Sequence, residues 1–179
     1  MLCTMKNLIL VLTFAAACAL MGCRSAAAPL DVPYAAAAPS GGVPPFKPGE
    51  RFVGISSSAC LGTCAVYELY VFSDGRVLFI GKQHTGHEGR ATKNIAPTVY
   101  QDLAVLLART GVLDREIKAG TCLTDHPHLT IMRGPSKQIE GIRRQELDSG
   151  CDGQADLARD IETRFIEDTE IQRWLVPSK

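Results

Sequence analysis

The chain has 179 residues, with 19 Lys and Arg against 19 Asp and Glu, so its formal net charge is zero at pH 7. Proteins that bind nucleic acid need a surplus or a stripe of positive charge to contact phosphates. The Arg143-Arg144 pair and the scattered lysines form neither, so nucleic acid is excluded as the expected partner. Once the N-terminal segments described below are set aside, residues 51–179 have the length of one small domain.

Residues 1–22 have the pattern of a bacterial signal peptide. Lys6 supplies a positive charge, and the apolar run from residue 8 to residue 20 is short for a bilayer span. The following Leu20-Met21-Gly22-Cys23 resembles the lipobox of bacterial lipoproteins, in which cleavage precedes a cysteine that is then acylated, with chains such as palmitate. The alternative is an ordinary secretory signal that ends at a chance cysteine.

The lipobox resemblance implies that Cys23 carries lipid and anchors the protein in a membrane. Arg24 rather than Asp follows this cysteine, which by resemblance to lipoprotein sorting signals implies the periplasmic face of the outer membrane. Residues 23–50 are rich in Ala, Pro and Gly and show no apolar period, so we expect a flexible tether. The alternative is that Val43-Pro44-Pro45-Phe46 docks on the domain as a cap. Residues 51–179 form the expected single domain.

Four cysteines remain after the signal and Cys23 are set aside: Cys60, Cys64, Cys122 and Cys151. In an oxidising envelope compartment they predict two disulfides, and spacing alone leaves three connectivities open. A redox role for the first pair is not indicated, because the spacing is C-x-x-x-C rather than C-x-x-C and no helix start follows to lower a thiolate pKa. We therefore interpret all four as structural cross-links.

The segment "VYELYVFSDGRVLFIGK" predicts a β-hairpin with Asp74-Gly75 as a two-residue turn. This register pairs Phe72 with Val77 and Leu69 with Ile80. One face is then aliphatic and forms the core, with Leu69, Val71, Leu78 and Ile80. The other face holds the candidate binding residues Tyr70, Phe72 and Phe79, together with Val77. This aromatic face is either covered by the segment around Phe52, Val53 and Ile55 or exposed as a recognition surface.

Two helices and a second hairpin complete the predicted fold. "APTVYQDLAVLLARTG" predicts a helix with Pro97 in the first turn and Gly111 after the last, which we expect to pack on the aliphatic hairpin face. "HLTIMRGPSKQIEGIR" predicts a hairpin that turns at residues 134–136, and "QADLARDIETRF" predicts a helix. We therefore expect an α+β fold: a mainly antiparallel sheet with two helices packed on it, in a strand-strand-helix order repeated twice.

Several of these residues resemble a family of bacterial envelope domains, domain of unknown function 6438. Its hallmark is C-x-G-x-C-P-x-Y before a strand and an Asp-Gly turn, with a later T-D-x-P, and the resemblance covers most of residues 52–175. Ala65 replaces the proline of the motif. The resemblance implies the pairs Cys60 with Cys64 and Cys122 with Cys151, and it assigns no activity. The matching positions are Cys60, Gly62, Cys64, Tyr67, Asp74, Gly75, Thr124, Asp125 and Pro127.

Candidate ligands for a metal lie in two predicted loops. One loop holds His84 and His87, and the other holds Asp125, His126 and His128. These residues would converge on zinc if the two hairpins lay side by side. The spacing matches no zinc signature, however, so we expect no metal or other cofactor. Asp125 has two interpretations of its own, a ligand-contacting carboxylate or an Asx-type turn.

The sequence contains no set of acid, base and nucleophile at recognisable spacing, and no G-x-S-x-G around Ser56 to Ser58. We therefore expect a lipid-anchored envelope module that binds an envelope protein or cell-wall component, or serves a structural role, without catalysing a reaction. The alternative is a zinc-dependent or other hydrolytic envelope enzyme that uses the two histidine loops.

Overall fold

The computed structural model describes residues 47, 49–118, 120–123, 125–135 and 141–176. The chain divides into two units, Met1–Val32 and Pro33–Lys179, and all described helices and strands belong to the second. The predicted signal peptide, the lipidation site Cys23 and the tether up to residue 46 lie outside the described residues.

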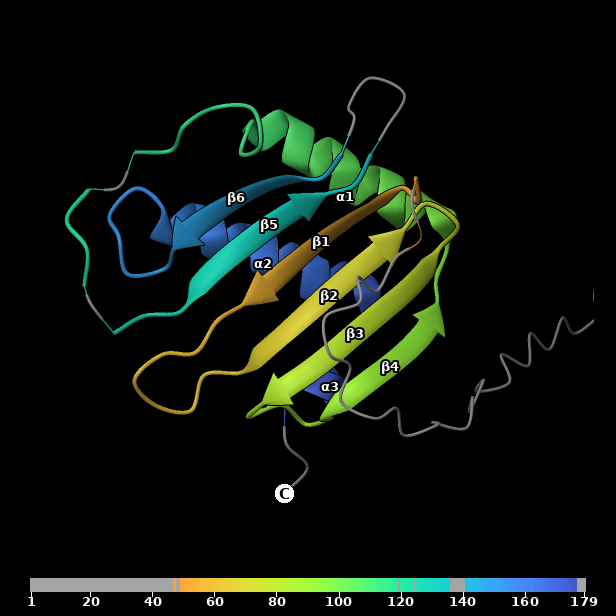
Figure 1. Cartoon of the computed structure of the whole chain (residues 1–179), viewed down its shortest axis with the longest axis horizontal. Coiled ribbons are helices and arrows are strands. Elements are labelled where there is room, and N and C mark those ends of the chain that lie inside the picture. Colours follow the sequence, from red (N-terminus) through yellow and green to blue (C-terminus); the bar gives the residue numbers. More distant parts are fainter. Residues whose placement is uncertain (1–46, 48, 119, 124, 136–140, 177–179) are drawn as a thin grey trace, which may run out of the picture. The chain divides into compact units, whose positions relative to one another are not determined.

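Six strands form one sheet in the order β4-β3-β2-β1-β5-β6 (Figure 1). Every neighbouring pair is antiparallel. The strands are β1 (Phe52–Ser57), β2 (Val66–Phe72), β3 (Arg76–Gln83), β4 (Gly89–Asn94), β5 (His128–Arg133) and β6 (Arg143–Asp148). The helices are α1 (Pro97–Thr110), α2 (Ala155–Thr169) and the short α3 (Gln172–Leu175).

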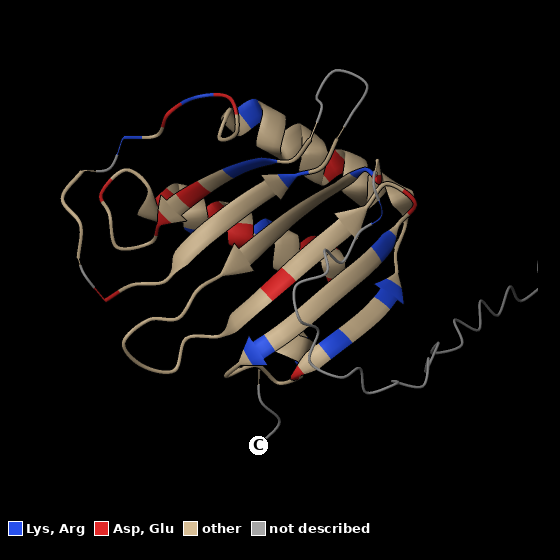
Figure 2. Ribbon diagram, in the orientation of Figure 1, with Lys and Arg blue, Asp and Glu red and all other residues tan. Residues whose placement is uncertain are grey.

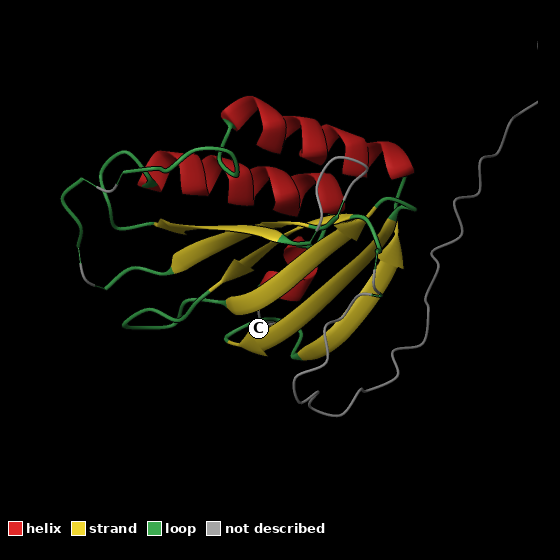
Figure 3. Cartoon of the chain, turned by 45° about the horizontal axis from the view of Figure 1, so that its top comes forward, coloured by secondary structure: helices red, strands yellow, loops and turns green. Residues whose placement is uncertain are grey.

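The two long helices cover one face of the sheet (Figure 3). The main core lies between these helices and the sheet, and both strands and helices contribute side chains to it. Its central side chains are Ile55, Leu69, Phe79, Ile131, Leu103, Leu107, Ile161 and Phe165, all at most 1% exposed. This architecture confirms the α+β class with an antiparallel sheet and packed helices. No described helix has the length and apolar character needed to cross a membrane.

The predicted repeat of strand-strand-helix does not occur, because four strands precede α1. β1 was not predicted as a strand, and its residues entered only as the cover in one of the two alternatives for the aromatic face. In the structure β1 lies between β2 and β5 in the middle of the sheet. Nor was β4 predicted, whose sequence GRATKN is mostly polar. An edge strand needs few apolar side chains, so β4 carries little periodic signal.

The predicted register of the β2–β3 hairpin is wrong by one residue. Leu69 pairs with Phe79 and Val71 with Val77, so the loop has three residues, 73–75, instead of two. Gly75 ends this loop with φ +89°, as is usual for three-residue hairpin loops. Because successive side chains alternate between faces, the shift moves all of β3 to the opposite face.

This one-residue shift of register gives each face of the hairpin both aliphatic and aromatic side chains, in place of one aliphatic and one aromatic face. Phe79 and Val77 join Leu69 and Val71 in the main core. Burying a phenyl group contributes about 1.5–3 kcal/mol, so this change of face matters for stability. The opposite face carries a smaller group of buried apolar side chains, which we call the second-face cluster. It consists of Phe52, Tyr70, Phe72, Leu78 and Met132, with Ile80 packed against it.

The second hairpin exists, but its connection is longer than predicted. β5 pairs with β6 from His128 opposite Asp148 to Arg133 opposite Arg143. The connection spans residues 134–142 and includes 136–140, which are not described. The second strand therefore begins after the segment KQIEGI that was expected to form it.

Both predicted long helices are present. α1 begins at Pro97 and is followed by Gly111 with φ +63°, whose N–H donates to the Ala108 carbonyl. Proline suits the first helical position and glycine the left-handed position after the last. α2 continues to Thr169, beyond the predicted end at Phe165, and the Thr169 hydroxyl donates to the Phe165 carbonyl at 2.6 Å.

One buried polar contact joins the sheet to α2. The Tyr67 hydroxyl on β2 donates to Glu162 Oε1 on α2 at 2.6 Å. Burial, followed by the charge of Glu162, raises the pKa of Tyr67 well above its ordinary value. On the opposite face the Tyr70 hydroxyl donates to Glu68 Oε2 at 2.8 Å, and burial followed by this hydrogen bond raises the pKa of Tyr70.

These two tyrosines predict a loss of stability at alkaline pH. Below about pH 10, the ordinary pKa of tyrosine, both phenols are protonated in the folded and the unfolded chain, so their contribution is complete. As the pH rises through this value the unfolded chain releases the protons and the folded chain retains them. The free energy of unfolding therefore falls.

Urea unfolding at a series of pH values between about 8 and 11 measures this effect. The combined Tyr67→Phe and Tyr70→Phe variant should lose much of the alkaline dependence. The same dependence in that variant and in the unmodified chain would contradict the assignment.

Candidate functional site

Four loops lie at the same end of the antiparallel sheet, and we call this group the loop end. It comprises residues 58–65 between β1 and β2, residues 84–88 between β3 and β4, the described part of residues 118–127 before β5, and residues 149–153 after β6. The other connections lie at the opposite end of the strands. All the cysteines and histidines of the described domain belong to the loop end or to the first residue of β5.

The first disulfide closes the loop between β1 and β2. Cys60 and Cys64 are joined with their Cα atoms 5.8 Å apart. A fully extended segment would hold these atoms roughly 13 Å apart, so the loop must turn, and Gly62 has φ +143°. The side chain of Leu61 at this turn is 78% exposed. The disulfide thus fixes a short loop that presents a large apolar side chain to solvent.

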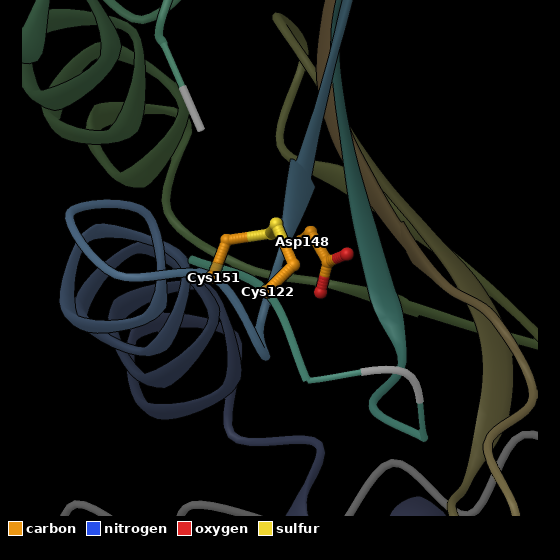
Figure 4. Close-up of side chains that lie close together, drawn as sticks. All are labelled: Cys122, Asp148 and Cys151. Carbon is orange, nitrogen blue, oxygen red and sulfur yellow. A yellow bond between two sulfur atoms is a disulfide. The ribbon is translucent and has the colours of Figure 1, made fainter. Parts of the chain in front are cut away.

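The second disulfide joins Cys122 to Cys151, across an isolated antiparallel bridge between the loops before β5 and after β6. Both disulfides have the pairing that the family resemblance implies. Among the described residues, one group has atoms placed closely enough for a metal ion: Cys122, Asp148 and Cys151 (Figure 4). Because the two sulfur atoms are bonded to each other, this group offers no thiolate ligand.

Asp148 and Gln154 hold the loop after β6 in place. Asp148 Oδ1 accepts a hydrogen bond from Gly150 N–H at 2.7 Å, so this carboxylate caps a turn. The buried Gln154 side chain accepts from Asp148 N–H and donates to the Ile117 carbonyl. These hydrogen bonds, together with the disulfide, connect the segment before β5, the end of β6 and the start of α2.

The two histidine loops do not converge. His84 and His87 follow β3, whereas His126 and His128 lie before and at the start of β5. Strands β2 and β1 separate β3 from β5, and three strand spacings amount to about 14 Å. Asp125 and His126 are exposed, and Asp125 lies in a turn. The shared metal site considered from the sequence therefore has no support in the arrangement of the described residues.

His128 and His87 take part in local contacts instead. The His128 Nδ1 atom lies 2.9 Å from Glu146 Oε1 on the neighbouring strand, and its Nε2 atom lies 4.0 Å from Asp148 Oδ2. The backbone of His87 donates to the Trp174 carbonyl at 3.0 Å, and the Trp174 ring packs on Phe79 with centroids 5.6 Å apart. The loop between β3 and β4 is thus closed by α3.

The three aromatic residues considered for binding are all buried. Tyr70 is 4% exposed, Phe72 is 1% exposed and Phe79 is 0% exposed. Phe79 lies in the main core, on the opposite face from Tyr70 and Phe72. Of the two alternatives drawn from the sequence, the exposed recognition surface is therefore wrong in this structure, since one side of the sheet cannot present all three and none is open to solvent.

Exposed apolar side chains are found instead on the two disulfide-bonded loops. Leu123, next to Cys122, is 65% exposed, and Leu61 lies between Cys60 and Cys64. Two hydrogen bonds connect these loops, because Ser58 N–H donates to the His128 carbonyl and His128 N–H donates to Ser58 Oγ. Figure 1 shows both loops at the same end of the sheet.

Charge does not mark any other described surface as a binding site. Lys and Arg are mixed with Asp and Glu over the loops and in β6, whereas β3 and β4 carry basic residues alone (Figure 2). Three of these, Arg76, Lys82 and Lys93, form ion pairs with acidic residues of other segments. The central strands carry almost no charge, with none in β1 and Glu68 alone in β2. Leu61, Leu123 and Gln154 were not predicted as site residues from the sequence. An apolar residue enclosed by two cysteines was a usable signal for Leu61, whereas Gln154 gave none.

The fold and the loop end define a class: a small α+β domain with a six-stranded antiparallel sheet, two long helices on one face and disulfide-bonded loops at one end. Residues 51–165 match the family Domain of unknown function (DUF6438). The chain belongs to this family, as its cysteine motif and Asp-Gly turn had indicated. No curated protein and no solved structure matches the chain.

The two disulfides predict unequal losses of stability. In the chain-entropy model, removing Cys122–Cys151 with its sequence separation of 29 costs about 3.5 kcal/mol, and removing Cys60–Cys64 with its separation of 4 costs about 2 kcal/mol. The double variants Cys122→Ala with Cys151→Ala and Cys60→Ala with Cys64→Ala serve as controls for each other. Urea unfolding measures the difference, and the reverse order would contradict it.

Proposed function

We propose that this protein is a lipid-anchored module on the periplasmic face of the outer membrane, and that its loop end binds an envelope protein or a cell-wall component without catalysing a reaction. The observation that carries the proposal is the exposure of Leu61 and Leu123 on two neighbouring, disulfide-bonded loops. Single exposed apolar residues are common on protein surfaces, whereas apolar side chains grouped in one patch mark interaction sites. In this proposal the two loops, joined by hydrogen bonds through Ser58 and His128, form such a patch.

The disulfides support binding because they reduce its entropic cost. A loop that is already held in one conformation loses little freedom when a partner contacts it. The Cys60–Cys64 bridge holds Leu61, and the Cys122–Cys151 bridge holds the residue beside Leu123. Neither leucine belongs to a core cluster, so the packing of the core does not account for an apolar residue at either position. A partner that covers both would remove their apolar surface from water.

The N-terminal sequence supports the membrane anchor. Residues 1–22 have the signal-peptide pattern, Leu20-Met21-Gly22-Cys23 resembles a lipobox, and Arg24 is the residue on which the outer-membrane assignment rests. Several acyl chains on one cysteine hold a protein stably at a membrane, whereas one chain binds only marginally. The disulfides fit the same compartment, since the periplasm is oxidising.

The anchor predicts that Cys23→Ser releases the protein from membranes. When the full chain is produced in a bacterium with a clickable palmitate analogue, the unmodified protein should be labelled and sediment with outer membranes. The Cys23→Ser variant should be unlabelled and absent from that fraction. Cys18→Ser is the matched control, because Cys18 is removed with the signal peptide in this proposal. Membrane-bound, labelled Cys23→Ser protein would contradict the anchor.

The binding surface predicts site-specific crosslinking from the loop end. The photoreactive residue p-benzoylphenylalanine, placed at position 61 or 123 of the full chain in cells, should give a discrete adduct on illumination. Val105 is the control position, because it is 47% exposed but lies on α1, away from the loop end. Its substitution should give no such adduct.

Treatment with a muramidase distinguishes the two partner classes, since it degrades an adduct with the cell wall and leaves a protein adduct intact. The Leu61→Asp and Leu123→Asp double variant should retain its unfolding free energy, because both side chains are exposed. With the photoreactive residue placed instead at position 126, an exposed position of the same loop end, this variant should lose the adduct that the chain with both leucines forms. Identical crosslinks from positions 61, 123 and 105 would contradict a specific loop-end surface.

A further inference from the structure

The second-face cluster is buried although the long helices pack on the other side of the sheet. Phe52 is 0% exposed, Phe72 1%, Tyr70 and Met132 4% and Leu78 5%. Their described apolar neighbours are members of β1, β2, β3 and β5, and the clusters place no described helix residue on this face. Figure 1 looks onto this face, with α2 behind the sheet.

The strands themselves are adapted to aromatic packing on this face. The rings of Phe52 and Tyr70 meet edge to face with centroids 5.6 Å apart. Gly54 makes room for the Tyr70 ring, because a Cβ on Gly54 would lie 3.0 Å from Tyr70 Cδ1 and 2.8 Å from the Leu69 carbonyl oxygen. The face is therefore an organised apolar surface and not a chance grouping of exposed side chains.

Ion pairs border this apolar surface. The Arg76 guanidinium lies over the Phe72 ring, 3.8 Å from its centroid, and forms an ion pair with Glu50. Lys82 pairs with Glu68, which also accepts the Tyr70 hydroxyl hydrogen bond. An apolar centre with a polar border is the pattern of an interaction surface, and an apolar occupant would remove its centre from water.

The N-terminal part of the chain approaches the domain on this same face. Glu50, which pairs with Arg76 above Phe72, accepts a hydrogen bond from the backbone N–H of Lys47 at 2.9 Å. Glu50 N–H also donates to the Lys47 carbonyl, and Gly49 has φ +78°, which together indicate a reverse turn. Residue 46 is therefore one bond away from a residue held beside the second-face cluster.

Residues 33–46, PYAAAAPSGGVPPF, have the composition and the length for this surface. They carry no charge and include Tyr34, Val43 and Phe46. Their four prolines lack an N–H, so fewer backbone donors are left unpaired when the segment lies on an apolar face. In polyproline II conformation fourteen residues extend about 43 Å. The distance from β1 to β4 is three strand spacings, or about 14 Å, so the segment is long enough to cross these strands.

We propose that residues 33–46 form a strap that packs on the second-face cluster, with Phe46 and the adjacent Pro44-Pro45 over Phe52, Phe72 and Met132. The strap gives this side of the sheet the cover that α1 and α2 give the other. A second copy of the chain is the competing occupant, and the experiment below separates the two.

The strap also shortens the tether of the anchor proposed above, and this consequence rests on that proposal. With residues 33–46 on the domain, residues 24–32 remain between the lipidated cysteine and the folded unit. Nine residues reach at most about 32 Å when fully extended. The domain is then held nearer to the membrane than a free tether of residues 24–50 would hold it.

Met132 offers a single reporter for this surface. The chain has four methionines, and Met1, Met5 and Met21 precede residue 24, so Met132 is the one natural methionine of a protein that begins at Arg24. This form retains every described element and both disulfides. Methionine labelled with ¹³C in its methyl group reports contacts by nuclear Overhauser effects, and relaxation by a soluble gadolinium chelate reports exposure.

In the protein of residues 24–179 we expect nuclear Overhauser effects between the Met132 methyl group and the Phe46 ring, and weak relaxation by the chelate. Removing residues 24–46 should raise this relaxation severalfold, and Phe46→Ala should raise it in part. Removal of residues 24–32 alone is the matched control and should change neither signal.

Three results would overturn the strap. One is unchanged protection of Met132 in a monomer that lacks residues 24–46. Another is the absence of any Phe46 contact in the intact protein, which stays decisive even if the shortened chain does not fold. The third is protection that disappears on dilution together with a dimer seen by analytical ultracentrifugation, which would identify a second copy as the occupant. None of these results depends on the membrane anchor.

Discussion

The register of the β2–β3 hairpin is the constraint on which the rest of the domain depends. The three-residue loop that ends at Gly75 pairs Leu69 with Phe79, and this pairing directs Phe79 toward the helices. Gly75 is also held closely, since its carbonyl accepts a hydrogen bond from Ile95 and a Cβ at this position would lie 2.3 Å from the Ile95 carbonyl oxygen. The hairpin turn thus also sets where β4 ends and α1 begins.

Both faces of the sheet are apolar, and the two faces are covered by different means. Helices α1 and α2 pack over the main core. The second face has a smaller, aromatic cluster bordered by the Glu50–Arg76 and Glu68–Lys82 pairs. A sheet with two apolar faces needs a layer on each side, and the proposed strap supplies the second layer at the point where the chain enters β1.

The loop end differs from both faces because covalent bonds, not a core, hold it together. Cys60–Cys64 fixes one loop within itself, whereas Cys122–Cys151 joins loops on either side of the β5–β6 hairpin. Gln154 adds hydrogen bonds between these segments. A surface fixed in this way keeps apolar side chains such as Leu61 in solvent without collapse onto the core, and this property underlies the proposed binding role.

Local sequence determined the features that depend on local chemistry: the two long helices with Pro97 and Gly111 at the ends of the first, the α+β class, the family, and disulfides whose pairing came from the family resemblance.

Only the tertiary structure decided the features that depend on distant partners. A two-residue and a three-residue turn both accommodate Asp74-Gly75, so the faces of β3 were undetermined until Phe79 packed against the helices. Strand β1 became central because β5 pairs with its free edge, and the two histidine loops stay apart because β1 and β2 lie between them. Strand order is set by long-range pairing, which leaves no periodic trace in the sequence.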